Sequence, residues 1–69
     1  MKTKTAIISI DDLTSQTIGT LSDLLKAIPG VESIDFSIER KVAVAEFDPT
    51  RTHVEELLRA VLKAGFRVS

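Results

Sequence analysis

The distribution of apolar residues predicts a strand and then a helix in the first part of the chain. Residues 5–10 are mostly apolar and β-branched, as is typical of a buried strand. From Ile18 to Ile28, apolar side chains recur every three or four positions, which is the spacing of one helix face. Pro29 and Gly30 should end this helix, because proline cannot continue a helix and glycine readily adopts the left-handed conformation at a helix end.

Residues 31–38 and 42–47 predict a β-hairpin. In the first of these segments apolar and polar side chains alternate, so that one face holds Ile34, Phe36 and Ile38. The charged residues 39–41 form a short reversal. Two strands separated by so few residues are expected to pair antiparallel.

Val42 and Val44 have two alternative placements in this hairpin. If Ala43, Ala45 and Phe47 face the helices, the two valines lie on the open face of the sheet. An apolar strip there would be a candidate interaction surface. In the alternative, a register shift or bulge turns the valines inward and leaves the alanines outside.

The last third of the chain predicts a second helix and a closing strand. Residues 48–51 are typical of a turn, and Thr52 with Glu55 has the spacing of a capping box. The apolar face of the helix would consist of Val54, Leu57, Leu58 and Val61. Gly65 should end the helix, and residues 66–69 would form a short strand.

This order of elements, β-α-β-β-α-β, predicts one α+β domain over residues 1–69. Two split βαβ units assemble most simply as a ferredoxin-like fold, a four-stranded antiparallel sheet with both helices on one face. Right-handed crossovers would place strands 5–10 and 42–47 in the centre. Strands 31–38 and 66–69 would then lie at the edges.

Composition and charge exclude several classes of function. A chain of 69 residues has little room for a deep enzyme cleft beside its core. A formal net charge of −1 gives no electrostatic reason to expect nucleic acid as a partner. No apolar run approaches the ~20 residues needed to insert across a membrane, and the run after the basic residues 1–5 is too short for a signal peptide. We therefore expect a cytoplasmic protein.

Three stretches, taken in order, resemble the heavy-metal-associated domain family, which includes small copper chaperones and metal-binding modules of metal-transporting ATPases. They are residues 24–31, the turn 47–49 and residues 57–66. The resemblance covers nearly the whole chain. It implies the ferredoxin-like fold, a role in metal transport, and a Met-Thr-Cys-x-x-Cys loop between the first strand and the first helix.

In this chain the loop has no cysteine. By the resemblance, Leu13 and Thr14 match the Met-Thr, Ser15 takes the place of the first cysteine and Thr17 that of the second, with Gln16 between them and the loop one residue short. Hydroxyls are neutral, hard ligands, whereas soft ions such as copper(I) prefer thiolates. Binding of a soft metal therefore does not carry over, and no cofactor is predicted. Instead, Thr14 or Ser15 is expected to cap the helix.

The remaining polar candidates have simple structural interpretations beside the functional ones. Asp11 and Asp12 could contribute oxygen ligands to a hard cation, but two carboxylates fall well short of the 6–8 oxygens that calcium prefers. Their structural role would be to end the strand and place negative charge near a helix N-terminus. His53 is the only histidine and is expected to be exposed at a helix start. No catalytic grouping or phosphate-binding loop is present, so we do not expect an enzyme.

Two hypotheses about function remain open. In the first, the chain is a degenerate member of the family that has lost its soft-metal ligands and acts as a binding or protein-interaction module. Its partner would be another ferredoxin-like or metal-transport domain, or a second copy of itself. In the second, it is a dimeric regulatory or small-molecule-binding ferredoxin-like module.

Overall fold

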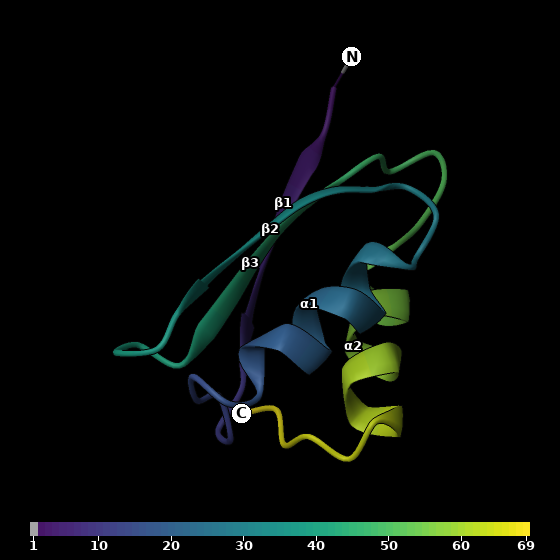
Figure 1. Cartoon of the computed structure of the whole chain (residues 1–69). Coiled ribbons are helices and arrows are strands. Elements are labelled where there is room, and N and C mark those ends of the chain that lie inside the picture. Colours follow the sequence, from purple (N-terminus) through teal and green to yellow (C-terminus); the bar gives the residue numbers. More distant parts are fainter. Residues whose placement is uncertain (1) are drawn as a thin grey trace.

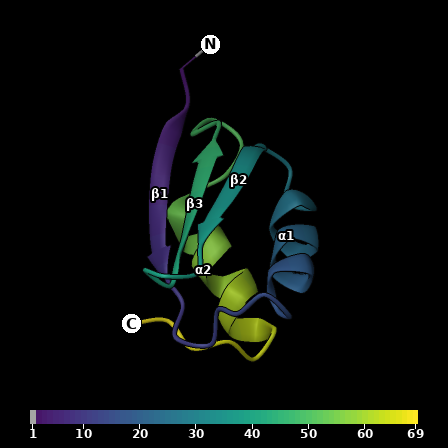
Figure 2. The same ribbon diagram turned by 60° about the vertical axis from the view of Figure 1, so that its left-hand side comes forward.

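The computed structural model describes residues 2–69. An antiparallel sheet carries two helices on one of its faces (Figures 1 and 2). In chain order the elements are β1 (Lys4–Ser9), α1 (Ile18–Lys26), β2 (Val31–Ser37), β3 (Val42–Phe47) and α2 (Val54–Lys63). These elements confirm the predicted α+β class and its order up to the second helix.

The prediction of a four-stranded sheet is wrong for residues 2–69. The described sheet has three strands in the order β1-β3-β2, so that β1 lies at an edge and not in the centre. In place of a fourth strand there is one isolated antiparallel bridge, between Ile10 and Val68. The closing segment follows Gly65 and meets only the end of β1, where it reaches no farther than Ser9. It therefore makes too few ladder hydrogen bonds to count as a strand.

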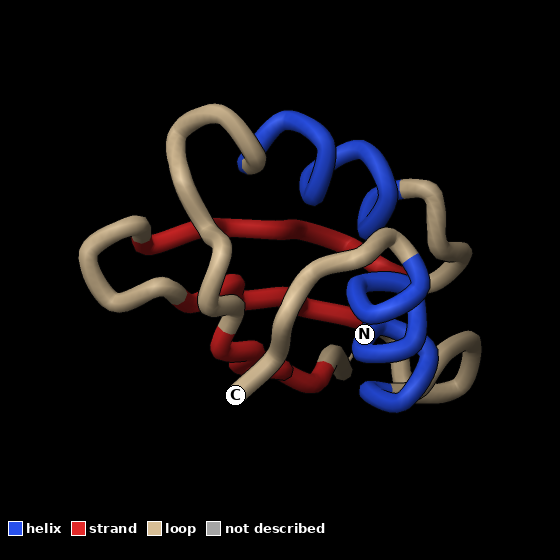
Figure 3. The backbone as a smooth tube through the Cα atoms, turned by 90° about the horizontal axis from the view of Figure 1, so that it is seen from below, coloured by secondary structure: helices blue, strands red, loops and turns tan. Residues whose placement is uncertain are grey.

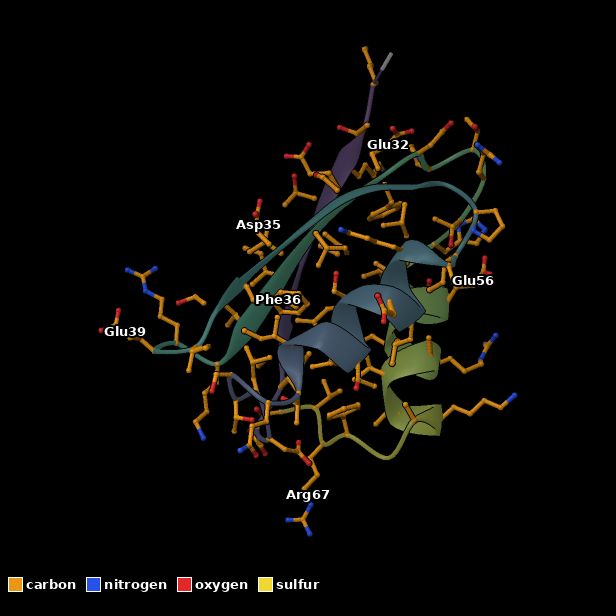
Figure 4. The ribbon with its side chains drawn as sticks, viewed as in Figure 1. Glu32, Asp35, Phe36, Glu39, Glu56 and Arg67 are labelled. Carbon is orange, nitrogen blue, oxygen red and sulfur yellow. The ribbon has the colours of Figure 1, made fainter. Side chains whose placement is uncertain are left out.

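The register of the sheet turns the alanines of β3 inward. Ala43 and Ala45 are fully buried and Phe47 nearly so, while Val42 and Val44 are half-buried on the opposite face. Of the two placements that the sequence allows, the structure has the one with the valines on the open face. Figure 4 shows the same alternation in β2, where Phe36 points toward the helices and Asp35 points away from them.

The core lies between the sheet and the two helices, whose arrangement Figure 3 shows from below. It consists of side chains from all three strands and both helices together with one loop residue, Leu13: Ala6, Ile8, Ile10, Leu13, Leu21, Leu25, Ala43, Ala45, Phe47, Leu57 and Val61. Ile38, predicted to share the apolar face of β2, lies instead in the turn after Ser37 and is 43% exposed. The turn that follows β2 is closed by the Lys41 N–H, which donates to the Ile38 carbonyl at 3.2 Å, and Lys41 itself has a positive φ of 56°.

The predicted capping box at Thr52 is also wrong. The N-cap residue of α2 is His53, whose side chain makes no capping hydrogen bond. Thr52 is fully buried, and its Oγ1 has no hydrogen-bond partner among the described residues. Its side chain is used for packing, with its Cγ2 methyl directed toward Gly30. The sequence thus has the residue types of a capping box, but the hydrogen bonds of a capping box are not formed.

The turn before α2 is fixed by Asp48. Its N–H donates to the Gly30 carbonyl at 2.7 Å, and its Oδ1 accepts from the Thr50 hydroxyl at 2.7 Å and the Thr50 N–H at 2.9 Å. The Thr50 hydroxyl, and then the Thr50 N–H, lower the pKa of the Asp48 carboxyl. The pKa of Asp48 is therefore lower in the folded chain than in the unfolded chain. These hydrogen bonds stabilise the fold fully at pH values above the unfolded-state pKa of Asp48, and this stabilisation is lost as the pH falls through its folded-state pKa.

A glycine series should separate close packing from backbone strain. Gly30 has φ +103°, and a Cβ there would lie 2.8 Å from Arg51 Cβ, whereas Gly65 has φ +95° with nothing within 4 Å. We expect Gly65→Ala to lower the free energy of unfolding by about 1 kcal/mol and Gly30→Ala by about 2 kcal/mol or more. Gly19→Ala, in an open part of α1, should raise it by about 0.5–1 kcal/mol.

Urea unfolding followed by far-ultraviolet circular dichroism measures all three changes. Equal losses at Gly30 and Gly65 would show that the approach of Arg51 to Gly30 contributes nothing.

Candidate functional site: the loop before α1 and the open sheet face

The loop from Asp11 to Thr17 is held in place by Leu13. This side chain is 1% exposed and belongs to the core, although it lies in no helix or strand. The Leu13 N–H donates to the Ile10 carbonyl at 3.2 Å, which turns the chain directly after β1. Thr14, Ser15 and Gln16 follow on the surface, and Thr17 is half-buried. The scaffold therefore presents the loop at the end of the sheet where the closing segment also lies.

The hydroxyls of Thr14 and Thr17 cap the turn that leads into α1. Thr14 Oγ1 accepts from the Gln16 N–H at 3.2 Å and the Thr17 N–H at 3.3 Å. Thr17 Oγ1 accepts from the Thr14 N–H at 2.9 Å and donates to the Asp12 carbonyl at 3.0 Å. The Ile18 N–H reaches the Thr14 carbonyl at 3.1 Å, so the helical turn in effect begins at Thr14. The N-cap residue of α1 itself is Thr17, whose side chain makes no capping hydrogen bond to the helix. Of the two predicted caps, Thr14 therefore caps the turn directly before α1, and Ser15 caps neither.

Asp11 and Asp12 bind the closing segment. Asp12 Oδ1 accepts from the Arg67 N–H at 2.9 Å, and Asp11 Oδ1 accepts from the Ser69 hydroxyl at 2.6 Å. The Asp11 N–H also donates to the Arg67 carbonyl at 2.9 Å. Figure 4 shows the Arg67 side chain pointing away from the domain, so its backbone and not its guanidinium makes these contacts. The two carboxylates therefore have a structural use that the sequence did not reveal.

Among residues 2–69, no group of three or more histidine, cysteine, aspartate or glutamate side chains could hold a metal ion. The structure brings Asp11 and Asp12 near the threonine pair, but adds no further carboxylate or imidazole to them. Their weak candidacy for a hard cation stays a prediction. His53 is exposed at the start of α2, away from the loop. Phe66 is half-buried and packs against the core.

On the open sheet face, the structure places Ile7 beside Val44. Ile7 is 70% exposed and pairs across the strands with Val44, which pairs in turn with Asp35. Val42 lies between Ser9 and Ser37. The prediction of a buried strand over residues 5–10 does not single out Ile7. The available signal was its alternation with Ala6 and Ile8, which face the core.

The geometry of this fold and loop matches known proteins. The model of the heavy-metal-associated domain matches residues 7–67. The chain belongs to the heavy-metal-associated domain family. The mercuric transport protein periplasmic component of an Alcaligenes species is 32% identical over 65 residues, covering 93% of this chain and 71% of that protein.

Solved structures agree with this assignment. Oxidized MerP from Ralstonia metallidurans CH34 is 30% identical with a TM-score of 0.89, and the match covers 99% of this chain and 96% of that one. Apo-CopP from Helicobacter pylori is 28% identical with a TM-score of 0.84, over 96% of this chain and all of the other. The CopZ metallochaperone, 19% identical with a TM-score of 0.89 over 96% of this chain and 100% of that one, supports the fold alone.

These matches confirm the predicted family and the ferredoxin-like fold. They relate the chain to proteins named for mercuric transport. In the part of the chain that the structure describes, no helix is long and apolar enough to cross a membrane. The cytoplasmic location stays a prediction.

The capping role of the loop can be tested by removing single hydroxyls. Thr14→Ala removes the hydroxyl that accepts from the Gln16 and Thr17 N–H groups and leaves the Thr17 N–H only its bond to the Thr14 carbonyl, so it should lower the free energy of unfolding by about 1 kcal/mol. Ser15→Ala is the matched control, because no hydrogen bond of the Ser15 hydroxyl is found within residues 2–69, and its effect should stay within about 0.5 kcal/mol. Chemical denaturation measures both, and equal effects would contradict the assigned cap.

Proposed function

We propose that this chain is a degenerate, non-enzymatic heavy-metal-associated domain that has lost its soft-metal ligands and acts as a protein-interaction module of a metal-transport system. The observation that supports this most directly is the loop. It keeps its position between β1 and α1, and Leu13 keeps it anchored in the core, yet no position holds a sulfur ligand.

The two hydroxyls that replace the cysteine pair are poor substitutes as ligands. The Ser15 side chain is exposed and uncharged, and a serine hydroxyl does not ionise near neutral pH. The Thr17 hydroxyl already donates to the Asp12 carbonyl and accepts from the Thr14 N–H. If the Thr17 hydroxyl turned to coordinate a metal, it would lose these two hydrogen bonds, which hold the turn before α1. Soft ions also gain less from hard oxygen than from thiolate sulfur. At Thr17 the hydrogen bonds of the turn and metal binding thus compete for the same oxygen, whereas Ser15 offers only a neutral hydroxyl.

An interaction role is supported by the surface that the domain exposes. Ile7, Val42 and Val44 form an apolar strip on the open sheet face. An apolar strip on an open sheet face is a common feature of contact surfaces. We propose as partner another ferredoxin-like or metal-transport domain, or a second copy, and keep the cytoplasm as the proposed location.

A second candidate function is a dimeric regulatory module that binds a small molecule. It is favoured by a hollow of about 430 Å³ between the start of β1 and the start of α2. Its lining combines apolar side chains with charged or titratable ones: Lys4, Thr5, Phe47, Pro49, His53, Val54 and Glu55. Such a mixture is typical of sites for small molecules with a polar group.

Titration of the purified domain with copper(I) tests the leading proposal. In competition with bathocuproine for copper(I), we expect no stoichiometric binding by the natural chain, because it offers no thiolate. Stoichiometric, sub-nanomolar binding of copper(I) would overturn the loss of soft-metal binding.

The double variant Ser15→Cys/Thr17→Cys should gain measurable but weak binding in the same assay. Two thiolates then lie near the start of α1, but the loop is one residue shorter than the family pattern. Binding as tight as that of an intact Cys-x-x-Cys domain, measured in parallel, would show that the loop has been aligned wrongly.

A further inference from the structure

Two exposed apolar surfaces lie on different sides of the molecule. The open sheet face carries the apolar strip of Ile7, Val42 and Val44, and both helices lie on the other side of the sheet (Figure 2). The second surface is a groove of about 510 Å³ along α2, lined by two leucines and three charged residues: Glu55, Leu58, Arg59, Leu62 and Lys63. Both surfaces consist of strand or helix residues.

The groove lies on the side of α2 that is turned away from the core. Leu57 and Val61 of α2 are fully buried in the core. Successive residues of a helix are about 100° apart around its axis, so Leu58 and Leu62 lie about 100° from the buried side. Leu62 is 56% exposed and Leu58 is half-buried. The helix therefore presents an apolar row, one turn long, that no part of residues 2–69 covers.

The charges beside the two apolar surfaces differ in sign. The strand residues that face outward on the open face are Thr5, Ile7 and Ser9 from β1, Val42, Val44 and Glu46 from β3, and Ser33, Asp35 and Ser37 from β2. They include two exposed carboxylates, Asp35 and Glu46, and no lysine or arginine. The groove has two exposed cations, Arg59 and Lys63, and one anion, Glu55. The two surfaces are thus both apolar in the middle and attract each other by charge.

We propose that the α2 groove of one copy of this chain docks on the open sheet face of a second copy. This inference deepens the interaction role proposed above and rests on it. Leu58 of one copy would cover Val42 of the other. Leu62 would cover Val44, which Ile7 borders on β1. The spacings agree, because four residues of a helix rise about 6 Å and two residues of a strand rise about 7 Å.

The charges also set the direction of α2 on the sheet. Glu46 lies near the end of β3, and Asp35 lies on β2 beside the middle of β3. If α2 runs in the same direction as β3, Lys63 meets Glu46, and Arg59 lies within reach of Asp35. Glu55 then lies over the start of β3, away from both carboxylates. The opposite direction would bring Glu55 toward these carboxylates, which is unfavourable.

Contact between two open faces is a poorer arrangement. It would place Asp35 and Glu46 of one copy against the same two carboxylates of the other. Docking of the groove on the face avoids this repulsion and joins unlike surfaces. Each copy then keeps one surface free, so the contact does not close at two copies and a third copy can add.

Sedimentation equilibrium of the metal-free natural chain, at concentrations up to about 1 mM, tests the proposal. Because the contact joins unlike surfaces, the average mass should rise reversibly from 7.5 kDa past twice that value. A natural chain that stays monomeric at every concentration would overturn the proposal, as would a mass that levels off at twice the monomer.

Two blocking variants identify the surfaces. Val44→Lys puts a positive charge on the open face, where the cations of the groove would meet it. Leu62→Glu puts a negative charge in the groove, where the carboxylates of the face would meet it. Each variant alone should be monomeric. An equimolar mixture should form a dimer with one copy of each and grow no further, because one intact groove and one intact face remain.

Conservative changes at the same positions are the matched controls. Val44→Ile and Leu62→Met keep the surfaces apolar and should associate within about twofold of the natural chain. Circular dichroism checks that every variant is folded. Association of Leu62→Glu alone would place the contact between two open faces, and association of Val44→Lys alone would place it between two α2 grooves. Either result would overturn the proposal, as would an equimolar mixture of these two variants that stays monomeric.

A charge exchange tests the direction of docking. Glu46→Lys and Lys63→Glu should each weaken association about threefold or more, because each places like charges together. The double variant restores opposite charges and should recover association to within about twofold. A double variant that associates no better than the single variants would overturn the docking arrangement.

These results are separable from those of the copper(I) titration. Tight copper(I) binding by a chain that associates through α2 and the open face would contradict the loss of soft-metal ligands and leave this inference intact. A strictly monomeric chain that binds no copper(I) would overturn this inference and leave the loss of soft-metal ligands standing.

Discussion

Burial of Leu13 is the contact on which the position of the loop depends. A side chain from an irregular segment fills the core between the sheet and the helices, so the residues on either side of it have little freedom. Asp11 and Asp12 are directed toward the closing segment, and Thr14 is placed where its hydroxyl meets the first free N–H groups of the helical turn. Burying a leucine contributes about 1.5–3 kcal/mol. A loop anchored in this way takes its position from the protein core.

Under the proposed function, the same anchoring explains how a metal-binding loop can lose its ligands and keep the fold. In a domain whose loop depended on the metal, replacing the ligands would leave the segment unstructured. Here the Thr14 and Thr17 hydroxyls bond to the backbone. Thr17 stands at one of the two positions that the resemblance gives to cysteine, and Thr14 stands just before the other. Under the proposed function, the turn before α1 is thus held by hydroxyls in place of a metal, and the scaffold remains available for contacts elsewhere on its surface.

Much of the fold could be predicted because its signals are local. Alternation in β2 and β3 and the helical spacing of α1 and α2 come from side chains that pack on one face, and Gly30 and Gly65 mark the turns with positive φ. The fourth strand could not be predicted correctly, because residues 66–69 have a strand-like pattern but reach only the end of β1. Thr52 matched a capping box, yet its burial beside Gly30 took precedence. The hydrogen bonds of Asp11 and Asp12 to the closing segment could not be predicted, because their partners lie more than fifty positions away in the sequence and no local pattern reveals such a contact.

The most direct test of the central claim is an amide proton–nitrogen correlation NMR spectrum of the domain, recorded before and after addition of one equivalent of copper(I) under reducing conditions. If the hydroxyl loop serves only as a helix cap, the resonances of residues 11–17 keep their positions. Stoichiometric shifts confined to these residues, in slow exchange, would show a bound ion at the loop and contradict the account.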